Sequence, residues 1–63
     1  MADFHPTIYQ VHLELQATHN WQASAAYRER MLAGLEERAR AAGKTSITVH
    51  GRYSYLGTFK VDG

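Results

Sequence analysis

One stretch, from Ser24 to Ala42, limits the possible folds of this 63-residue chain more than any other. Its apolar and alanine side chains recur at every fourth position, as Tyr27, Met31, Leu35 and Ala39. Side chains three or four residues apart share one face of an α-helix, so this spacing predicts a helix with one apolar face. Gly43 follows directly, and glycine often occurs just after the end of a helix. We therefore expect a helix over residues 21–42.

The start of this helix is open to two interpretations. Asn20 and Ser24 are both of the residue types that cap helix N-termini, and a first turn at Asn20 would place Trp21 at the helix mouth. Gly34 lies inside the expected helix, where glycine costs roughly 1 kcal/mol relative to alanine. It either faces solvent or permits another backbone, such as that of a second subunit, to approach closely.

Residues 7–16 alternate between apolar and polar side chains, which is typical of a half-buried β-strand. The apolar side chains on one face are Tyr9, Val11, Leu13 and Leu15. The polar side chains on the other face are Gln10, His12, Glu14 and Gln16. Residues 1–6 are expected to be a lead-in to this strand.

Residues 45–61 predict a β-hairpin with strands over 45–50 and 53–61. A turn at His50-Gly51-Arg52 separates apolar from polar side chains well, and it favours the following register. The side chains expected to point inward are Ile47, Val49, Tyr53, Tyr55, Phe59 and Val61. Those expected to point outward are Thr48, Ser54, Leu56, Thr58 and Lys60. A turn at Leu56-Gly57 is the alternative, and it would make Gly51 a β-bulge in a longer strand.

The order strand, helix, strand, strand predicts an α+β fold: a single two-layer βαββ domain over residues 1–63, with one helix on one face of a three-stranded sheet. The strand at 53–61 lies either between the other two or outside them. Because one helix covers one face of such a sheet, we expect the second face to be open.

Size and composition favour association. A chain of this length buries only about 60% of its unfolded surface, so small domains usually gain stability from disulfides, metals or oligomer contacts. The sequence has no cysteine, which excludes disulfides and thiolate zinc sites. We therefore expect a homo-oligomer.

The charge and hydropathy of the chain exclude other classes of protein. The formal net charge is +1, which is unlike the strongly basic balance of a general nucleic-acid coat. No apolar run approaches the roughly 20 residues of a membrane span, so no membrane partner is expected. The N-terminal residues lack the pattern of a signal peptide, and a cytoplasmic location is expected.

The expected open face and hairpin tip carry the polar residues that we predict to bind a partner. These residues are Gln10, His12, Glu14, Thr48, His50, Arg52, Ser54 and Lys60. Other apolar side chains have no obvious place in a one-helix core and are predicted to contact other subunits: Phe4, Ile8, Trp21 and Leu56. Partial burial at the rim of its own fold is an equally good interpretation for Trp21.

His12 and Glu14 share a face that His50 could approach, and such a set of side chains is of the type that binds zinc or another divalent ion. If the last strand lies in the middle of the sheet, the two histidines are roughly 10 Å apart, which is too far for one ion. Only direct pairing of the strands at 7–16 and 45–50 would bring them together. We predict no metal and no cofactor.

Two families of small oligomeric proteins resemble parts of the chain. Pro6-Thr-Ile-Tyr-Gln-Val-His is similar to the opening strand of four-oxalocrotonate tautomerases, whose catalysis depends on an N-terminal proline. Five residues precede Pro6 here, so its nitrogen is an amide and is no base. The span from Ile8 to Leu35 is similar to the flavin-binding dodecins, but their flavin-stacking tryptophan corresponds to a strand that here reads Ser46-Ile-Thr-Val. No functional residue is carried over from either family.

Three functions follow as expectations. The first is a non-catalytic oligomeric binding or regulatory protein that acts on a protein partner through the open face or hairpin tip. The alternative is a nucleic-acid-binding protein that uses the same face; Tyr53 and Tyr55 would turn outward for base stacking only if the register slipped. The third is an enzyme or ligand-binding shell formed between subunits, with His12 and Glu14 as a conceivable acid–base pair; without a nucleophile motif, we assign no catalytic residue.

Overall fold

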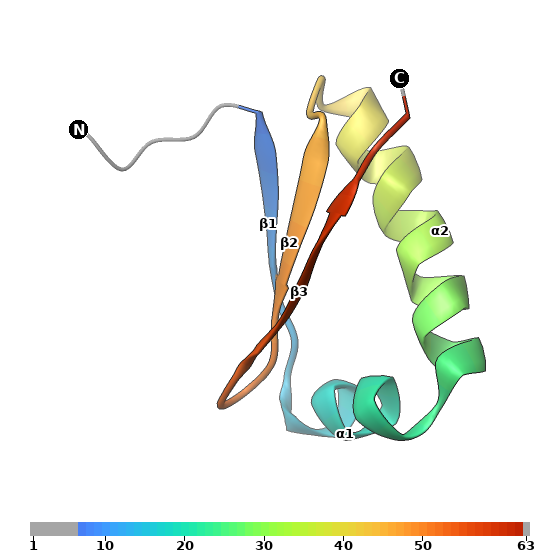
Figure 1. Ribbon diagram of the computed structural model, residues 1–63, viewed down its shortest axis with the longest axis vertical. Coiled ribbons are helices and arrows are strands. Elements are labelled where there is room, and N and C mark those ends of the chain that lie inside the picture. Colours follow the sequence, from blue (N-terminus) through green and yellow to red (C-terminus); the bar gives the residue numbers. More distant parts are fainter. Residues whose placement is uncertain (1–6, 63) are drawn as a thin grey trace.

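A three-stranded mixed sheet and two helices make up the computed structural model, which describes residues 7–62 (Figure 1). In chain order the elements are β1 (Ile8–His12), α1 (Leu15–Ala23), α2 (Ala25–Ala41), β2 (Ser46–His50) and β3 (Tyr55–Lys60). The strand order is β1-β2-β3, with β1 parallel to β2 and β3 antiparallel to it. The α+β class and the three-stranded sheet are therefore confirmed, and the last strand lies on the outside.

β1 is shorter than the strand predicted over residues 7–16. The N–H of Leu13 donates to the carbonyl of His50 at 2.8 Å, and β2 ends at that histidine. Beyond this point no strand within residues 7–62 is available for β1 to pair with, because β2 leads into a turn at Gly51. The backbone satisfies its hydrogen-bonding groups by starting α1 at Leu15 instead.

Two helices replace the single helix predicted over residues 21–42. Ser24 separates them with an extended backbone (φ −137°, ψ 115°), and its hydroxyl accepts a hydrogen bond from the N–H of Tyr27 at 3.1 Å. Ser24 is therefore the N-cap of α2, whereas Asn20 lies inside α1. The guanidinium of Arg28 donates to the carbonyl of Trp21 at 2.6 Å, which satisfies an acceptor at the end of α1.

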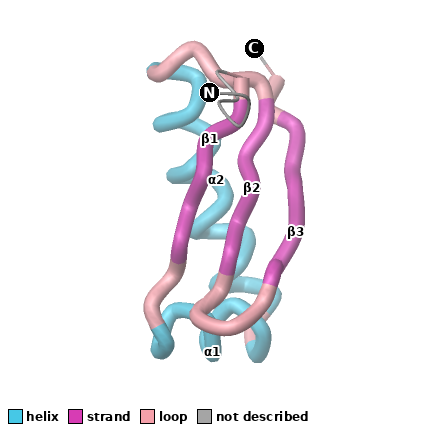
Figure 2. The backbone as a smooth tube through the Cα atoms, turned by 90° about the vertical axis from the view of Figure 1, so that its left-hand side faces the viewer, coloured by secondary structure: helices cyan, strands magenta, loops and turns pink. Residues whose placement is uncertain are grey.

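The core lies between α2 and the sheet, and α2 runs along one side of the strands (Figure 2). Its buried apolar side chains are Trp21, Leu35, Ala39, Ile47, Val49 and Val61. The two from central strand β2, Ile47 and Val49, are 0% exposed. The ring of Trp21 meets that of Phe59 edge-on, with centroids 5.9 Å apart, so α1 closes one end of this core.

The hairpin has a different register from either predicted one. Ile47 pairs with Phe59, but at the end of β2 the register shifts so that Val49 pairs with Gly57 and His50 with Tyr55. One extra residue, Leu56, therefore lies in β3 as a β-bulge. The inward prediction holds for Ile47, Val49, Phe59 and Val61.

The bulge reverses three side chains relative to the prediction. Tyr53 and Tyr55, predicted to point inward, are 82% and 60% exposed, whereas Leu56 packs against the core. Gly57 accommodates the bulge because its φ of 148° is in a region that other residues rarely adopt. A Cβ on Gly57 would also lie 3.0 Å from the ring of Phe59, so a side chain has no room there.

The end of the long helix agrees with the sequence. α2 ends at Ala41, and Gly43 follows in a left-handed conformation with φ 75°. Gly34 is exposed on α2, and nothing comes within 4 Å of a Cβ built on it. Among the described residues, no other backbone approaches Gly34.

Candidate functional site

Three aromatic rings cross the open face of the sheet, one from each strand. His12 lies directly opposite His50, and their rings stack with centroids 4.8 Å apart and planes 12° from parallel. The ring of Tyr55 meets that of His50 at 5.8 Å and 62°. We call these three residues the ring cluster.

Hydrogen bonds hold two members of the ring cluster, His50 and Tyr55, in place. Nε2 of His50 lies 3.3 Å from Oε1 of Gln10, and the hydroxyl of Tyr55 is hydrogen-bonded to that of Thr58. Thr58 in turn lies 3.4 Å from the hydroxyl of Thr48. Rings tethered in this way lose little freedom when a ligand contacts them, which favours binding.

The exposed rings of the hairpin extend this surface. Tyr55 is more than half exposed although it contacts His50, and Tyr53 at the tip is exposed almost entirely. The guanidinium of Arg52 lies 5.9 Å from the ring centroid of Tyr53, within the range of a cation–π contact. A flat ligand could therefore stack on either tyrosine.

The charge of this surface has one sign. The strands and the turn between β2 and β3 contain no aspartate or glutamate, but they carry Arg52 and Lys60. Within residues 7–62 the acidic side chains lie on the helices or beside their ends and after β3: Glu14, Glu29, Glu36, Glu37 and Asp62. The open face is thus suited to an anionic partner.

The hairpin tip is fixed to α1. The buried hydroxyl of Thr18 accepts a hydrogen bond from the N–H of Arg52 at 2.8 Å and donates to the carbonyl of Glu14 at 2.8 Å. A Cβ on Gly51 would lie 2.7 Å from the methyl group of Thr18, so the turn packs closely on the helix. Arg52 and Tyr53 are therefore presented by an anchored turn.

The structure groups most of the predicted binding residues. Gln10, His12, Thr48 and His50 lie on the open face, and Lys60 lies there as the partner of Ser46. Arg52 and Ser54 form part of the turn at the tip. Glu14 is the exposed N-cap residue of α1, beyond the end of β1, and so stands apart from the face.

Thr58 was expected to point outward but was not among the predicted binding residues, and the prediction missed Tyr53 and Tyr55 as members of this surface. The only sequence signal for them was Gly57, because a glycine inside a strand often marks a bulge, and a bulge exchanges the two faces of the strand beyond it.

The residues predicted to contact other subunits are divided by the structure. Trp21 is 3% exposed in the core of its own chain, so it offers no surface to a second subunit. Ile8 and Leu56 are half-buried. Phe4 lies outside the described residues.

A metal site would need β1 and β2 to pair directly, so that His12 and His50 lie close together. The two strands are neighbours, and the two histidine rings are in contact. Within residues 7–62, however, no three histidine, aspartate or glutamate side chains are grouped so that they could hold an ion. Glu14, the third ligand considered, lies beyond the strand.

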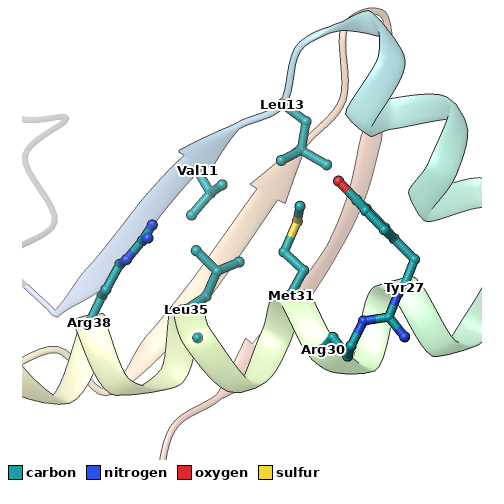
Figure 3. A pocket seen from close by; sticks show the side chains of 8 residues that line it. Val11, Leu13, Tyr27, Arg30, Met31, Leu35 and Arg38 are labelled. Carbon is teal, nitrogen blue, oxygen red and sulfur yellow. The ribbon is translucent and has the colours of Figure 1, made fainter.

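A second surface lies between β1 and α2. It is an open groove with a volume of about 450 Å³ (Figure 3). The residues that line it are Val11, Leu13, Tyr27, Arg30, Met31, Gly34, Leu35 and Arg38. The apolar side chains point toward one another across the groove, and the two arginines lie at its ends (Figure 3).

Comparisons with protein-family models, with curated proteins and with solved structures give no match to this chain. Neither helix within residues 7–62 has the length and apolar character needed to cross a membrane.

Proposed function

We propose that the protein is a non-catalytic binding protein whose open sheet face receives single-stranded nucleic acid. The observation that supports this most is the position of Tyr55, which is exposed on that face and in contact with His50 of the ring cluster. The sequence favours a protein partner first, because the domain is small and its sheet has open edges and an open face, and it places nucleic acid second because both hairpin tyrosines were expected inside. With both exposed, the order of the two functions is reversed.

Stacking is the physical basis of the proposal. Bases of single strands stack on exposed aromatic side chains of open sheets, and each such contact contributes about 1–3 kcal/mol without strong dependence on sequence. Tyr53 and Tyr55 provide two such rings, and the histidines of the ring cluster adjoin the second. Arg52 and Lys60 supply positive charge for the phosphates.

A protein partner on the same face is the second candidate, because tyrosine and arginine are also frequent in protein–protein interfaces. The two functions differ in their response to salt. Phosphate contacts release counterions, so nucleic-acid affinity falls as salt rises, whereas contact with a neutral protein surface depends on salt much less.

The test is fluorescence anisotropy with a labelled single-stranded RNA of about ten nucleotides, a length within the site size of small binding folds. Replacement of Tyr55 by alanine removes the stacking ring and should weaken binding about 5- to 150-fold. Tyr55→Phe keeps the ring and is the matched control, with nearly unchanged affinity. Absence of binding at low salt, or equal affinity of Tyr55→Ala and the unmodified protein, would contradict the proposal.

We also infer that the protein is a homo-oligomer. Within the described residues, no further strand covers the edge strand β3, which leaves this edge free to pair with a second copy. Exposed edges favour pairing with another chain, and a small domain gains stability from it. Light scattering over a range of protein concentrations tests this directly; a strict monomer at all concentrations would refute it and leave the nucleic-acid proposal intact.

A further inference from the structure

The groove between β1 and α2 combines an apolar floor with a cationic rim. Val11 and Leu13 of β1 and Met31 and Leu35 of α2 form the floor. Along the rim, Arg30, Gly34 and Arg38 follow one another at intervals of four residues on the same helix face. Because Gly34 has no side chain, the rim has a gap between its two arginines.

Both rim arginines lack a partner within residues 7–62. Other arginines of α2 have structural roles: Arg28 donates to the carbonyl of Trp21, and Arg40 to that of Asp62. The guanidinium groups of Arg30 and Arg38 make no hydrogen bond or ion pair to any described residue. Two free guanidinium groups at the ends of an apolar groove are complementary to an occupant with two carboxylates and an apolar centre.

The edge of β1 beside the groove can pair with a further strand. The N–H of Leu13 bonds to His50, and the carbonyl of Thr7 accepts from Ser46 at 3.2 Å, so the odd-numbered residues of β1 direct their backbone groups toward β2. The backbone groups of Gln10 and His12 therefore point toward the outer edge. No strand among the described residues occupies that edge.

We propose that this groove binds an extended acidic peptide segment of another protein, which adds to β1 as a fourth strand. Arg30 and Arg38 are eight residues apart on a helix, which corresponds to about 12 Å. Strand positions i and i+4 are about 13 Å apart and point to the same side. The peptide therefore carries aspartate or glutamate at i and i+4, and an apolar side chain at i+2 enters the groove at the Gly34 gap.

A second copy of the chain fits the groove less well. If β1 of another copy added to this edge, its groove-facing side chains would be Tyr9, Val11 and Leu13, none of which is acidic. Both guanidinium groups would remain unpaired. The proposal is also separate from nucleic-acid binding, because Gln10 and His12 belong to the opposite face of β1.

Binding of the fluorescein-labelled peptide STETFTETS, measured by anisotropy, tests the proposal. The matched control peptide, SETTFTTES, has the same composition and charge, but its carboxylates point away from the side of the phenylalanine when the chain is extended. We expect the first peptide to bind at least about 10-fold more tightly, because only it can reach both arginines.

Protein variants locate the site. Arg30→Gln and Arg38→Gln should each weaken peptide binding about 2- to 10-fold. Gly34→Leu should also weaken peptide binding, because the leucine side chain would fill the gap between the two arginines. Arg52→Gln and Tyr55→Ala, on the other surface, should leave it unchanged. In the unmodified protein, peptide addition should slow amide hydrogen exchange at Gln10 and His12.

Several outcomes would overturn the proposal. These are equal binding of the two peptides, no binding of either, and affinity that is unchanged in Arg30→Gln and Arg38→Gln. A dimer that dissociates in Gly34→Leu would show that a second copy occupies the groove, and it too would overturn the proposal. Circular dichroism confirms that each variant is folded before its affinity is compared.

Discussion

The hydroxyl of Thr18 in α1 lies 2.8 Å from the backbone nitrogen of Arg52 in the hairpin tip. The same hydroxyl donates to the carbonyl of Glu14, so one buried side chain satisfies two backbone groups from distant parts of the sequence. Through this contact α1 determines where the hairpin presents Arg52 and Tyr53.

Replacement of Thr18 by valine tests this anchor. Valine keeps the shape of threonine but leaves the N–H of Arg52 without its acceptor, which should lower the free energy of unfolding by about 1–3 kcal/mol. Urea denaturation measures the change. Thr45→Val is the control, because its exposed hydroxyl makes only a 3.4 Å contact with Thr7 and should alter stability by less than about 0.5 kcal/mol. Equal stability of the two variants would refute the anchoring role.

Replacing each of two glycines by alanine should change the free energy of unfolding in opposite directions. Gly57→Ala forces a side chain into a positive-φ position and against Phe59, so it should destabilise the protein by about 1–3 kcal/mol. Gly34→Ala meets no neighbour within 4 Å in a helix, and it should stabilise by about 0.5–1 kcal/mol. Thermal or urea unfolding measures both. A stabilising Gly57→Ala would mean that the bulge is absent in solution.

The single tryptophan reports on the core. Because Trp21 is buried within its own chain, its fluorescence should have the emission maximum of an apolar environment, and this should not change on dilution. Unfolding in urea should shift it to longer wavelength. A red shift on dilution alone would instead place Trp21 in a subunit contact. Trp21→Ala should cost about 3–5 kcal/mol, enough to unfold a domain of this size.

Salt dependence tests the cations of the open face. If Arg52 and Lys60 each contact a phosphate, replacing either by glutamine should make the slope of log affinity against log salt less steep by about 0.7. Arg40→Gln, a change on α2, is the control and should leave the slope unaltered. An identical slope in all variants would exclude the phosphate contacts.

Amide hydrogen exchange tests the strand order. β2 has neighbours on both sides, so the amides of Ile47 and Val49 should exchange slowest. The amide of Gln10 points to the outer edge of β1 and should exchange fast in the isolated protein. Slow exchange at Gln10 would show that another chain already pairs with this edge.

The sequence alone determined the main elements of this fold. The spacing of Tyr27, Met31 and Leu35 required a helix with one apolar face, and the alternation around Gln10 and His12 required a strand. These patterns depend on local periodicity, so they can be recognised in a single sequence without knowledge of the tertiary structure. They were sufficient to predict the α+β class and most of the polar residues on the open face.

Tertiary contacts decided the register of the hairpin and hence the character of the candidate site. Tyr55 and Phe59 have the same parity in the sequence, yet the bulge at Leu56 places them on opposite faces. Burial favours this arrangement, because Leu56 packs in the core while Gly57 accepts the unusual backbone and the close ring of Phe59. Likewise β1 ends at His12 because β2 turns away at Gly51, a constraint that no local pattern contains.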